Sequence, residues 1–306
     1  MDSIVDALFK GERWAIAKAI SVLEDDGIQA REIVEMIFRH SGKARVVGVT
    51  GPAGAGKSTL VGKMIGVYRA RGFRVGVLAV DPSSSISGGA ILGDRVRMQE
   101  HALDEGTYIR SMASRGASGG ISSALRDAIR VLDVAGFNRI IVESVGAGQL
   151  DVKISSIADV TIVVLNPQTG DSIQAIKAGL TEVGDIYVVN KADISGANLL
   201  YNDVRSLVVD GRDAVVLKTV ASTGKGVDEL VDAIERSLEK KLSNGYKERE
   251  RKRVESELMD IVLGMLLKVA QERIRREHDM VDRVMKREID PYRAAESIVS
   301  RVVRDG

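Results

Sequence analysis

The sequence contains no cysteine, and its 306 residues include only three histidines. Without cysteine the chain has no disulfide, zinc–thiolate site, iron–sulfur cluster or thiol nucleophile. His40, His101 and His278 lie far apart in the sequence, so a surface or capping role is expected for each rather than a metal site. Aromatic residues make up 4% of the chain, which leaves few platforms for stacking nucleobases.

An excess of one charge and a long apolar run are also missing. The net charge is +1 although 28% of residues are charged, and this balance argues against a general nucleic-acid binder. The longest apolar run, residues 261–267, is far too short to span a bilayer, and residues 1–14 lack a signal-peptide pattern. A cytoplasmic protein without nucleic-acid or membrane partners is therefore expected, with one large domain plus extensions.

The motif that organises the chain lies in residues 45–59, RVVGVTGPAGAGKST. A strand of mostly β-branched residues leads into G-x-x-x-x-G-K-[ST], the phosphate-binding loop, and then a helix. The glycines allow backbone N–H groups to point at a polyphosphate near the positive end of that helix. Lys57 can reach the β and γ phosphates, and the Ser58 hydroxyl can hold Mg²⁺. The residues expected to contact nucleotide are Gly51, Pro52, Ala53, Gly54, Ala55, Gly56, Lys57, Ser58 and Thr59.

Strand-like and helix-like segments alternate over residues 45–217. Most strands are continuous Val/Ile runs, as expected for a sheet covered by helices on both faces. The alternation predicts an α/β fold with a doubly wound, mainly parallel sheet. The predicted strands are residues 46–50, 75–80, 107–110, 139–143, 160–165, 186–190 and 214–217. The predicted helices are residues 58–71, 121–135, 172–180, 199–208 and 226–241.

Helical segments flank this region at both ends. Apolar spacing predicts two or three short helices at the N-terminus. The C-terminal segment is rich in Glu, Lys and Arg, and predicts one long helix or two stacked ones, then a short helix from Pro291. It either packs on the same domain or joins two copies of the chain, and the sequence leaves both open. The predicted division is an N-terminal helical extension (1–42), a P-loop domain (43–243) and a C-terminal helical arm (244–306).

Acidic residues lie at or after the ends of predicted strands. Asp81 ends the second strand, Asp94 lies in the polar loop beyond it, and Glu143 ends the strand RIIVE. Ligands of such sheets bind at the carboxyl ends of the strands, and Mg²⁺ prefers oxygen ligands. Each acid alone could cap a helix or lie in a solvated turn, but together with Ser58 they predict a magnesium site. Gln149, just beyond the glycines after Glu143, is a candidate for positioning water.

A second nucleotide motif, Asn190-Lys191-Ala192-Asp193, follows the apolar run IYVV. A carboxylate at the position of Asp193 can accept hydrogen bonds from guanine N1–H and the 2-amino group. Adenine offers neither donor there and leaves the charge unpaired, so GTP is predicted over ATP. One strand later, a polar turn is of the kind whose backbone N–H supports the guanine carbonyl. The residues of this turn are Ala221, Ser222 and Thr223.

Taken together, these motifs resemble the MeaB/ArgK family of P-loop GTPases, a branch of the SIMIBI class that includes bacterial MeaB and the human mitochondrial MMAA-type protein. The resemblance covers nearly the whole chain and rests on GPAGAGKST, VDPSSS, GDRVRM, VESVGAGQ, GDSIQAIKAG, NKAD and ASTGKG in this order. It implies a GTPase that uses GTP and Mg²⁺, with Asp81, Asp94 and Glu143 serving the magnesium and the hydrolytic water. The predicted catalytic residues are Lys57, Asp94, Glu143 and Gln149, and the predicted metal ligands are Ser58, Asp81, Asp94 and Glu143.

The resemblance also implies a homodimer that acts as a GTP-driven chaperone of an adenosylcobalamin-dependent methylmalonyl-CoA mutase or a related acyl-CoA mutase. It would gate cofactor delivery and protect the mutase from inactivation. Intrinsic hydrolysis is expected to be slow, because no arginine finger can be assigned among Arg95, Arg97 and Arg115. Residues 168–179 correspond to an additional switch, in which Gln168-Thr169 stands where members often have Gly-Ser.

Three other functions compete with this interpretation. An ATP-using kinase tied to arginine/ornithine transport would prefer ATP and need an acceptor pocket, and no acceptor motif is visible. A metal-inserting GTPase of hydrogenase or urease maturation would carry Cys/His clusters, which this chain lacks. A purely structural interaction module would not explain a phosphate loop combined with a guanine motif.

Overall fold

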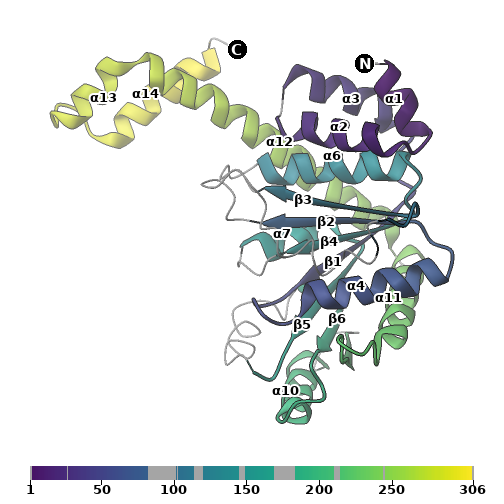
Figure 1. Cartoon of the computed structure of the whole chain (residues 1–306). Helices are drawn as coiled ribbons and strands as arrows, with labels where there is room; N and C mark the ends of the chain where they lie inside the picture. The colour runs from purple at the N-terminus through teal and green to yellow at the C-terminus, as the bar shows by residue number, and fades with distance from the viewer. Residues whose placement is uncertain are drawn as a thin grey trace. The chain divides into compact units, whose positions relative to one another are not determined.

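A computed structural model, shown in Figure 1, describes most of the chain. The described residues are 2–25, 27–81, 101, 103–113, 120–144, 149–168, 183–209, 214–243 and 245–304. Two compact units are present, Met1–Arg253 and Val254–Gly306.

Within the first unit, the described residues form a seven-stranded sheet. All neighbouring strands are parallel, in the order β3-β2-β4-β1-β5-β6-β7. Their bounds are β1 Arg45–Thr50, β2 Val75–Asp81, β3 Thr107–Ala113, β4 Arg139–Ser144, β5 Val160–Leu165, β6 Ile186–Val189 and β7 Val215–Lys218. The predicted doubly wound, parallel α/β fold is confirmed. Because β1 lies between β4 and β5, where the connections diverge to opposite sides, ligands are expected at its carboxyl end.

Helices connect and flank these strands. Their bounds are α1 Asp2–Phe9, α2 Arg13–Glu24, α3 Ile28–Phe38, α4 Lys57–Ala70, α6 Gly120–Val134, α7 Gln149–Ile157, α10 Ala197–Val209, α11 Val227–Ser243, α12 Tyr246–Arg276, α13 His278–Met285 and α14 Pro291–Arg304. The sequence did not predict α7, because in this short helix, QLDVKISSI, polar and apolar residues mostly alternate, which is not the spacing of a helix. The helix predicted at residues 172–180 lies outside the described residues.

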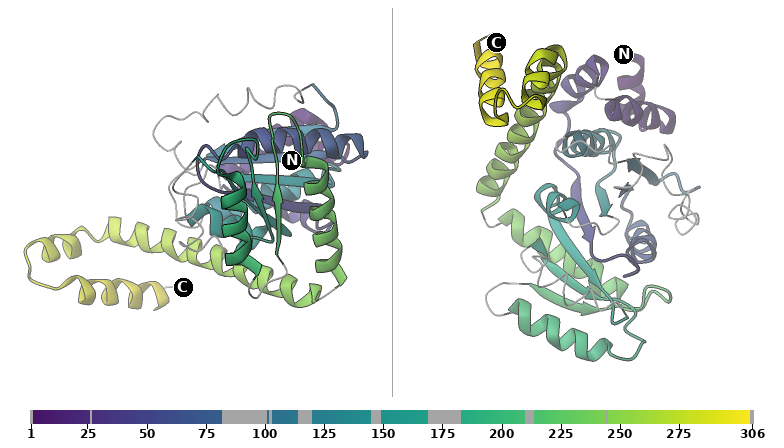
Figure 2. Two further views of the ribbon diagram at one scale, coloured as in Figure 1. Left: turned by 90° about the horizontal axis from the view of Figure 1, so that it is seen from below. Right: turned by 90° about the vertical axis from the view of Figure 1, so that its left-hand side faces the viewer.

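Helices cover both faces of the sheet (Figures 1 and 2). Successive strand residues point to opposite faces, so neighbouring positions enter different cores. Helices α4 and α11 pack with Val49 and Ile141 on one face. Helices α6 and α7 pack with Ile140 and Val142 on the other face, where α10 covers β5 and β6. The two faces matter for the site, because consecutive residues at a strand end then have different neighbours.

The three N-terminal helices belong to the core on the α6 side. Ile16 and Ile33 are fully buried there, in one cluster with residues of α6. Asp133 of α6 accepts hydrogen bonds from the backbone N–H groups of residues 42–44, at 3.0 Å for Lys43 and 2.9 Å for Ala44. The segment predicted as an extension (1–42) therefore packs as part of the first unit. Its connection to β1 is held by the hydrogen bonds to Asp133.

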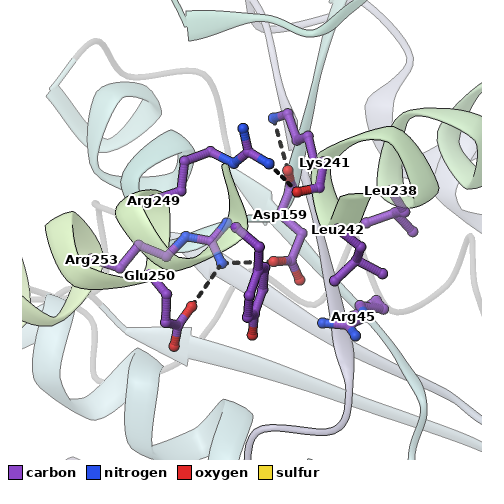
Figure 3. A pocket seen from close by; sticks show the side chains of 9 residues that line it. Arg45, Asp159, Leu238, Lys241, Leu242, Arg249, Glu250 and Arg253 are labelled. Atoms are coloured by element: carbon purple, nitrogen blue, oxygen red, sulfur yellow. Dashed lines mark hydrogen bonds and ion pairs between the residues drawn. The ribbon is translucent and has the colours of Figure 1, made fainter. Parts of the chain in front are cut away.

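The first two turns of α12 are bound at the amino end of β5, and the last turn of α11 is bound at the amino ends of β5 and β6 (Figure 3). Arg253 Nη1 lies 2.6 Å from Asp159 Oδ1, and its Nη2 donates to the Ala158 carbonyl at 2.5 Å. Lys241 Nζ donates to the Asp159 carbonyl at 2.9 Å and to Asp185 Oδ2 at 2.7 Å. Because of these contacts, the first unit ends at Arg253 rather than at the predicted boundary, residue 243.

The second unit contains the rest of α12, followed by α13 and α14. Met280, Ala294 and Ile298 form its small buried core, with Val284 and Ile289 packed against them. The observed pattern is the predicted alternative with two helices before the one that begins at Pro291. In the described part of the chain, no helix is long and apolar enough to cross a membrane.

Candidate functional site

The phosphate-loop sequence forms the turn between β1 and the N-terminus of α4. Gly51 has φ 135° and Gly56 has φ 90°, a region that favours glycine. A Cβ on Gly51 would collide with the Val164 carbonyl oxygen, and a Cβ on Gly56 would collide with Asn190 Nδ2. The loop therefore lies directly on the residues that end β5 and β6, and only glycine fits at these two positions.

Lys57 is folded back over this loop. Its side chain is 94% buried, and Nζ donates to the Gly51 carbonyl at 2.8 Å and to the Pro52 carbonyl at 3.0 Å. The ammonium group thus lies above the cradle, next to the N-terminus of α4. Bound phosphates would meet both this cation and the helix N–H groups.

Ser58 and Glu143 are brought together from different elements. The Ser58 hydroxyl, in the first turn of α4, donates to Glu143 Oε1 at 2.6 Å, and both residues are buried. Glu143 reaches this position because it pairs in register with Val49 of the adjacent β1. The pair lies at the carboxyl ends of the central strands, beside the phosphate loop.

The other predicted acidic and water-positioning residues are described less fully. Asp81 is the last residue of β2, two strands from β1, and Gln149 is the first residue of α7; only their backbones are described. Asp94 lies outside the described residues. The structure thus places Ser58 in contact with Glu143. The full set of four magnesium ligands remains a prediction.

The donor set at Ser58 fits a hard divalent cation, because it consists of a hydroxyl and a carboxylate oxygen beside the phosphate cradle. Among the described residues, no group of three or more His, Asp or Glu side chains could hold a metal by itself. Mg²⁺ is commonly held by one or two protein oxygens together with the phosphates of a nucleotide, which is what this geometry offers.

The guanine motif begins with a buried asparagine. Asn190 Nδ2 donates to the Ala55 carbonyl of the phosphate loop at 2.9 Å. Its Oδ1 accepts from Thr219 Oγ1 at 3.1 Å and from the Ala221 N–H at 3.0 Å. Asn190 therefore joins the phosphate loop to the turn after β7, and its role in the described contacts is to hold these parts together.

Lys191 and Asp193 follow on the surface. Lys191 adopts φ 54°, and Asp193 is exposed. The bend at Lys191 turns the chain away from β6 immediately after the buried Asn190. The exposed carboxylate of Asp193 is thus available at the same strand end as the phosphate loop.

The turn predicted to support the guanine carbonyl is closed by its own hydrogen bonds. Val220 pairs with Lys225, and the Val220 carbonyl accepts from the N–H groups of Thr223 and Gly224 at 3.1 and 3.0 Å. Ala221 is buried, while Ser222 and Thr223 are exposed. The turn therefore has a fixed backbone next to Asn190, with its tip open to a ligand.

One residue of the site was not predicted from the sequence. Asn166, directly after β5, is fully buried, and its Nδ2 donates to the Gly54 carbonyl at 3.1 Å. Its Oδ1 accepts from the Gln168 N–H at 2.8 Å, and Gln168 Oε1 accepts from Lys191 Nζ at 3.1 Å. A polar residue immediately after the apolar run VTIVVL was the available signal, since strand ends carry the site residues in this fold.

Comparison with known proteins gives a match over most of the chain. The family model described as methylmalonyl Co-A mutase-associated GTPase MeaB matches residues 16–275. The Pyrococcus horikoshii protein PH0274, whose name describes it as a GTPase, is 43% identical over 99% of this chain and 98% of its own length. The mouse mitochondrial protein named methylmalonic aciduria type A homolog is 32% identical, over 80% of this chain and 65% of its own length.

A solved structure has the same fold. The crystal structure of an LAO/AO transport system kinase has a TM-score of 0.72 and covers 98% of this chain and 97% of its own. At 24% sequence identity, this likeness shows the fold alone.

Proposed function

The chain belongs to the MeaB family of P-loop GTPases, and from this premise we propose that it assists an adenosylcobalamin-dependent methylmalonyl-CoA mutase or a related acyl-CoA mutase. In this role, GTP binding and hydrolysis control the loading of the mutase cofactor and protect the mutase from inactivation, with the cytoplasm as the proposed compartment. The observation that carries the proposal is the family match, which spans both nucleotide motifs and nearly all of α12. The name of the mouse relative supports the same class of client.

At the phosphate end, the proposed roles of the side chains follow from their positions around the loop. Lys57 exchanges its two backbone carbonyl partners for phosphate oxygens and offsets the charge on the β and γ phosphates. Ser58 holds Mg²⁺, which when bound neutralises phosphate charge, and Asp81, Asp94 and Glu143 are the proposed remaining ligands. The predicted tasks of Glu143 and Gln149 also include orienting the attacking water.

At the base end, Asp193 is proposed to read guanine, and the turn after β7 to support its carbonyl. Asn190 fixes that turn and the phosphate loop to one another through the contacts of its side-chain amide. Lys191 lies between Asp193 and Asn190 in sequence and binds Gln168. A nucleotide that fills both ends is therefore bound across one connected set of hydrogen bonds.

The function is tested by affinity capture from a lysate that contains the client mutase. The tagged wild-type chain, loaded with a non-hydrolysable GTP analogue, is expected to retain a cobalamin-dependent acyl-CoA mutase, and retention is expected to change when GDP replaces the analogue. The purified mutase should also accelerate GTP hydrolysis, because a switch whose intrinsic hydrolysis is slow depends on a partner to complete its catalytic site. Equal retention in both nucleotide states and no acceleration would contradict the proposal.

A homodimer joined by α12 is the second part of the proposal. No residue of α12 is fully buried within the chain, and Leu258, Val262 and Leu266, at 56%, 48% and 51% exposure, recur every four residues on one face. Contiguous exposed apolar surface of this kind marks interaction sites. A second copy of the same helix is the proposed occupant of this face.

The variant Val262→Glu/Leu266→Glu is expected to be a monomer, because two carboxylates would be desolvated in the apolar contact. Multi-angle light scattering of the full-length chain measures the change. Leu199→Glu/Leu207→Glu, which places two carboxylates on exposed leucines of α10, serves as the control and should leave the dimer intact. A dimer that survives the double substitution would exclude this face as the contact.

A further inference from the structure

The end of β4 presents two consecutive polar residues to opposite sides of the sheet. Glu143 shares its face with Ile141 and α4, while Ser144 shares the other face with Val142 and α7. Glu143 belongs to the site already described. Ser144 is fully buried on the far side of the sheet, where no nucleotide contact is proposed.

Ser144 is part of a buried polar chain on that far side. Its Oγ lies 2.6 Å from Asp151 Oδ1, and 3.2 Å from Thr50 Oγ1. Ser144 has one hydroxyl proton, and a carboxylate can only accept, so that proton goes to Asp151 and the Thr50 hydroxyl donates to the Ser144 oxygen. Thr50 is the last residue of β1, immediately before the phosphate loop, and is fully buried, while Asp151 is 97% buried.

We propose that Asp151 is a positioning residue for GTP hydrolysis, which acts through Ser144 to fix the carboxylate of Glu143. The end of β4 is held from both faces: Glu143 is bound to Ser58 at 2.6 Å, and the next residue is bound to Asp151 at 2.6 Å. A β-strand that is fixed on one face alone can rotate or shift at its end. The contact with Asp151 prevents this movement and holds the Glu143 carboxylate at a fixed position beside the phosphate loop.

Helix α7 is well suited to carry this group. Asp151 lies in its first turn, where a carboxylate interacts favourably with the helix dipole. The helix itself is fixed against β1, because Ile154 of the helix and Ala158 just after it pack onto Gly48, where a Cβ would lie 2.8 Å from Ile154 Cγ2. The same rigid helix therefore packs on β1 through its apolar residues and holds β4 through Asp151.

The size of the effect follows from the geometry that catalysis needs. A displacement of about 1 Å, caused by a change away from the reacting atoms, can lower the rate by about 10²-fold. Ground-state binding depends on other contacts, namely the backbone of the phosphate loop and the Asn190 network. Loss of Asp151 should therefore lower kcat more than it weakens nucleotide binding.

The test compares Asp151→Ala and Ser144→Ala with the wild-type chain. Each is expected to lower kcat for GTP hydrolysis by about tenfold or more, while the Kd values of fluorescent GTP and GDP analogues change by less than about threefold. The double variant should cost little more than the worse single one, since both remove the same contact. If Asp151→Ala does not fold, Ser144→Ala, which removes the same contact, carries the test, and Asp151→Asn, which keeps one acceptor oxygen for Ser144, should retain most of the wild-type kcat.

A control separates positioning from general destabilisation. Asp133→Ala removes a carboxylate of α6 that accepts from the backbone N–H groups of Lys43 and Ala44, at the end of β1 opposite to the phosphate loop, and should lower thermal stability without changing kcat. A matching loss of kcat in Asp133→Ala, or an unchanged kcat in Asp151→Ala, would overturn the inference.

The inference rests on the proposed role of Glu143, so Glu143→Gln is measured in parallel. If Glu143→Gln keeps full activity, the role of Glu143 itself is wrong, and with it the reason to position this side chain. If Glu143→Gln loses activity while Asp151→Ala and Ser144→Ala retain it, the positioning role alone is wrong.

Discussion

Replacing Lys57 by alanine is expected to lower GTP hydrolysis by about 10³-fold, because the main cation of the phosphate loop is lost. Lys57 is buried at the cradle and donates to two loop carbonyls, at 2.8 and 3.0 Å. Charge that develops on the phosphate oxygens during transfer would then lose its nearest side-chain partner. Single-turnover hydrolysis, measured with the nucleotide in excess of its Kd, separates this effect from weaker binding.

The neighbouring lysine provides the matched control. Lys63 lies on the same helix, α4, and Lys63→Ala removes the same charge and the same number of atoms away from the loop. Its hydrolysis rate is expected to stay within about twofold of the wild type. Activity retained by Lys57→Ala would place the phosphates elsewhere, in conflict with the loop geometry described for Gly51 and Gly56.

The sheet could be predicted from the sequence because its strands are buried on both faces. Runs such as VTIVVL at β5 have no polar face, and such runs are typical of parallel strands under two helical layers. The phosphate loop and the NKAD motif could be predicted because each requires a fixed residue type at a fixed spacing. These patterns are local, so one sequence is enough to recognise them.

Features that depend on register could not be predicted in this way. Asn166 donates to the Gly54 carbonyl only because β5 lies beside β1, with Thr50 opposite Val163. The residues of these two strands do not reveal that they are neighbours in the sheet. The contact between Ser144 and Asp151 likewise depends on α7, a short helix whose alternating polar and apolar residues do not have helical spacing. Long-range neighbours of this kind appear once the strands are placed side by side.

The boundary of the C-terminal arm shows a different limit of local patterns. Composition changes near residue 244, yet the first unit ends at Arg253. The charged run that begins α12 looks like a solvated helix surface, but Arg253 is 73% buried as it binds Asp159. A truncation meant to remove only the arm should accordingly end after Arg253.

Replacing Asp193 by asparagine is expected to weaken GTP binding by about 10²-fold or more and to favour xanthosine triphosphate. The carboxylate of Asp193 can accept from guanine N1–H and from the 2-amino group. An asparagine amide would instead present an N–H donor to one of these donors, and this mismatch costs binding energy. Xanthine has a carbonyl oxygen at the 2-position, which the new amide can satisfy.

Isothermal titration calorimetry with GTP, ATP and xanthosine triphosphate measures this exchange of specificity. Asp228→Asn, at an exposed aspartate in the first turn of α11, changes the charge equally and should leave GTP affinity unaltered. The same titrations decide between a guanine switch and an ATP-using kinase, since the kinase requires tighter ATP than GTP binding in the wild type. Unchanged GTP affinity in Asp193→Asn would remove Asp193 from the base site. Specificity would then have to come from the turn after β7, which is held to Asn190 through Ala221 and exposes Ser222 and Thr223.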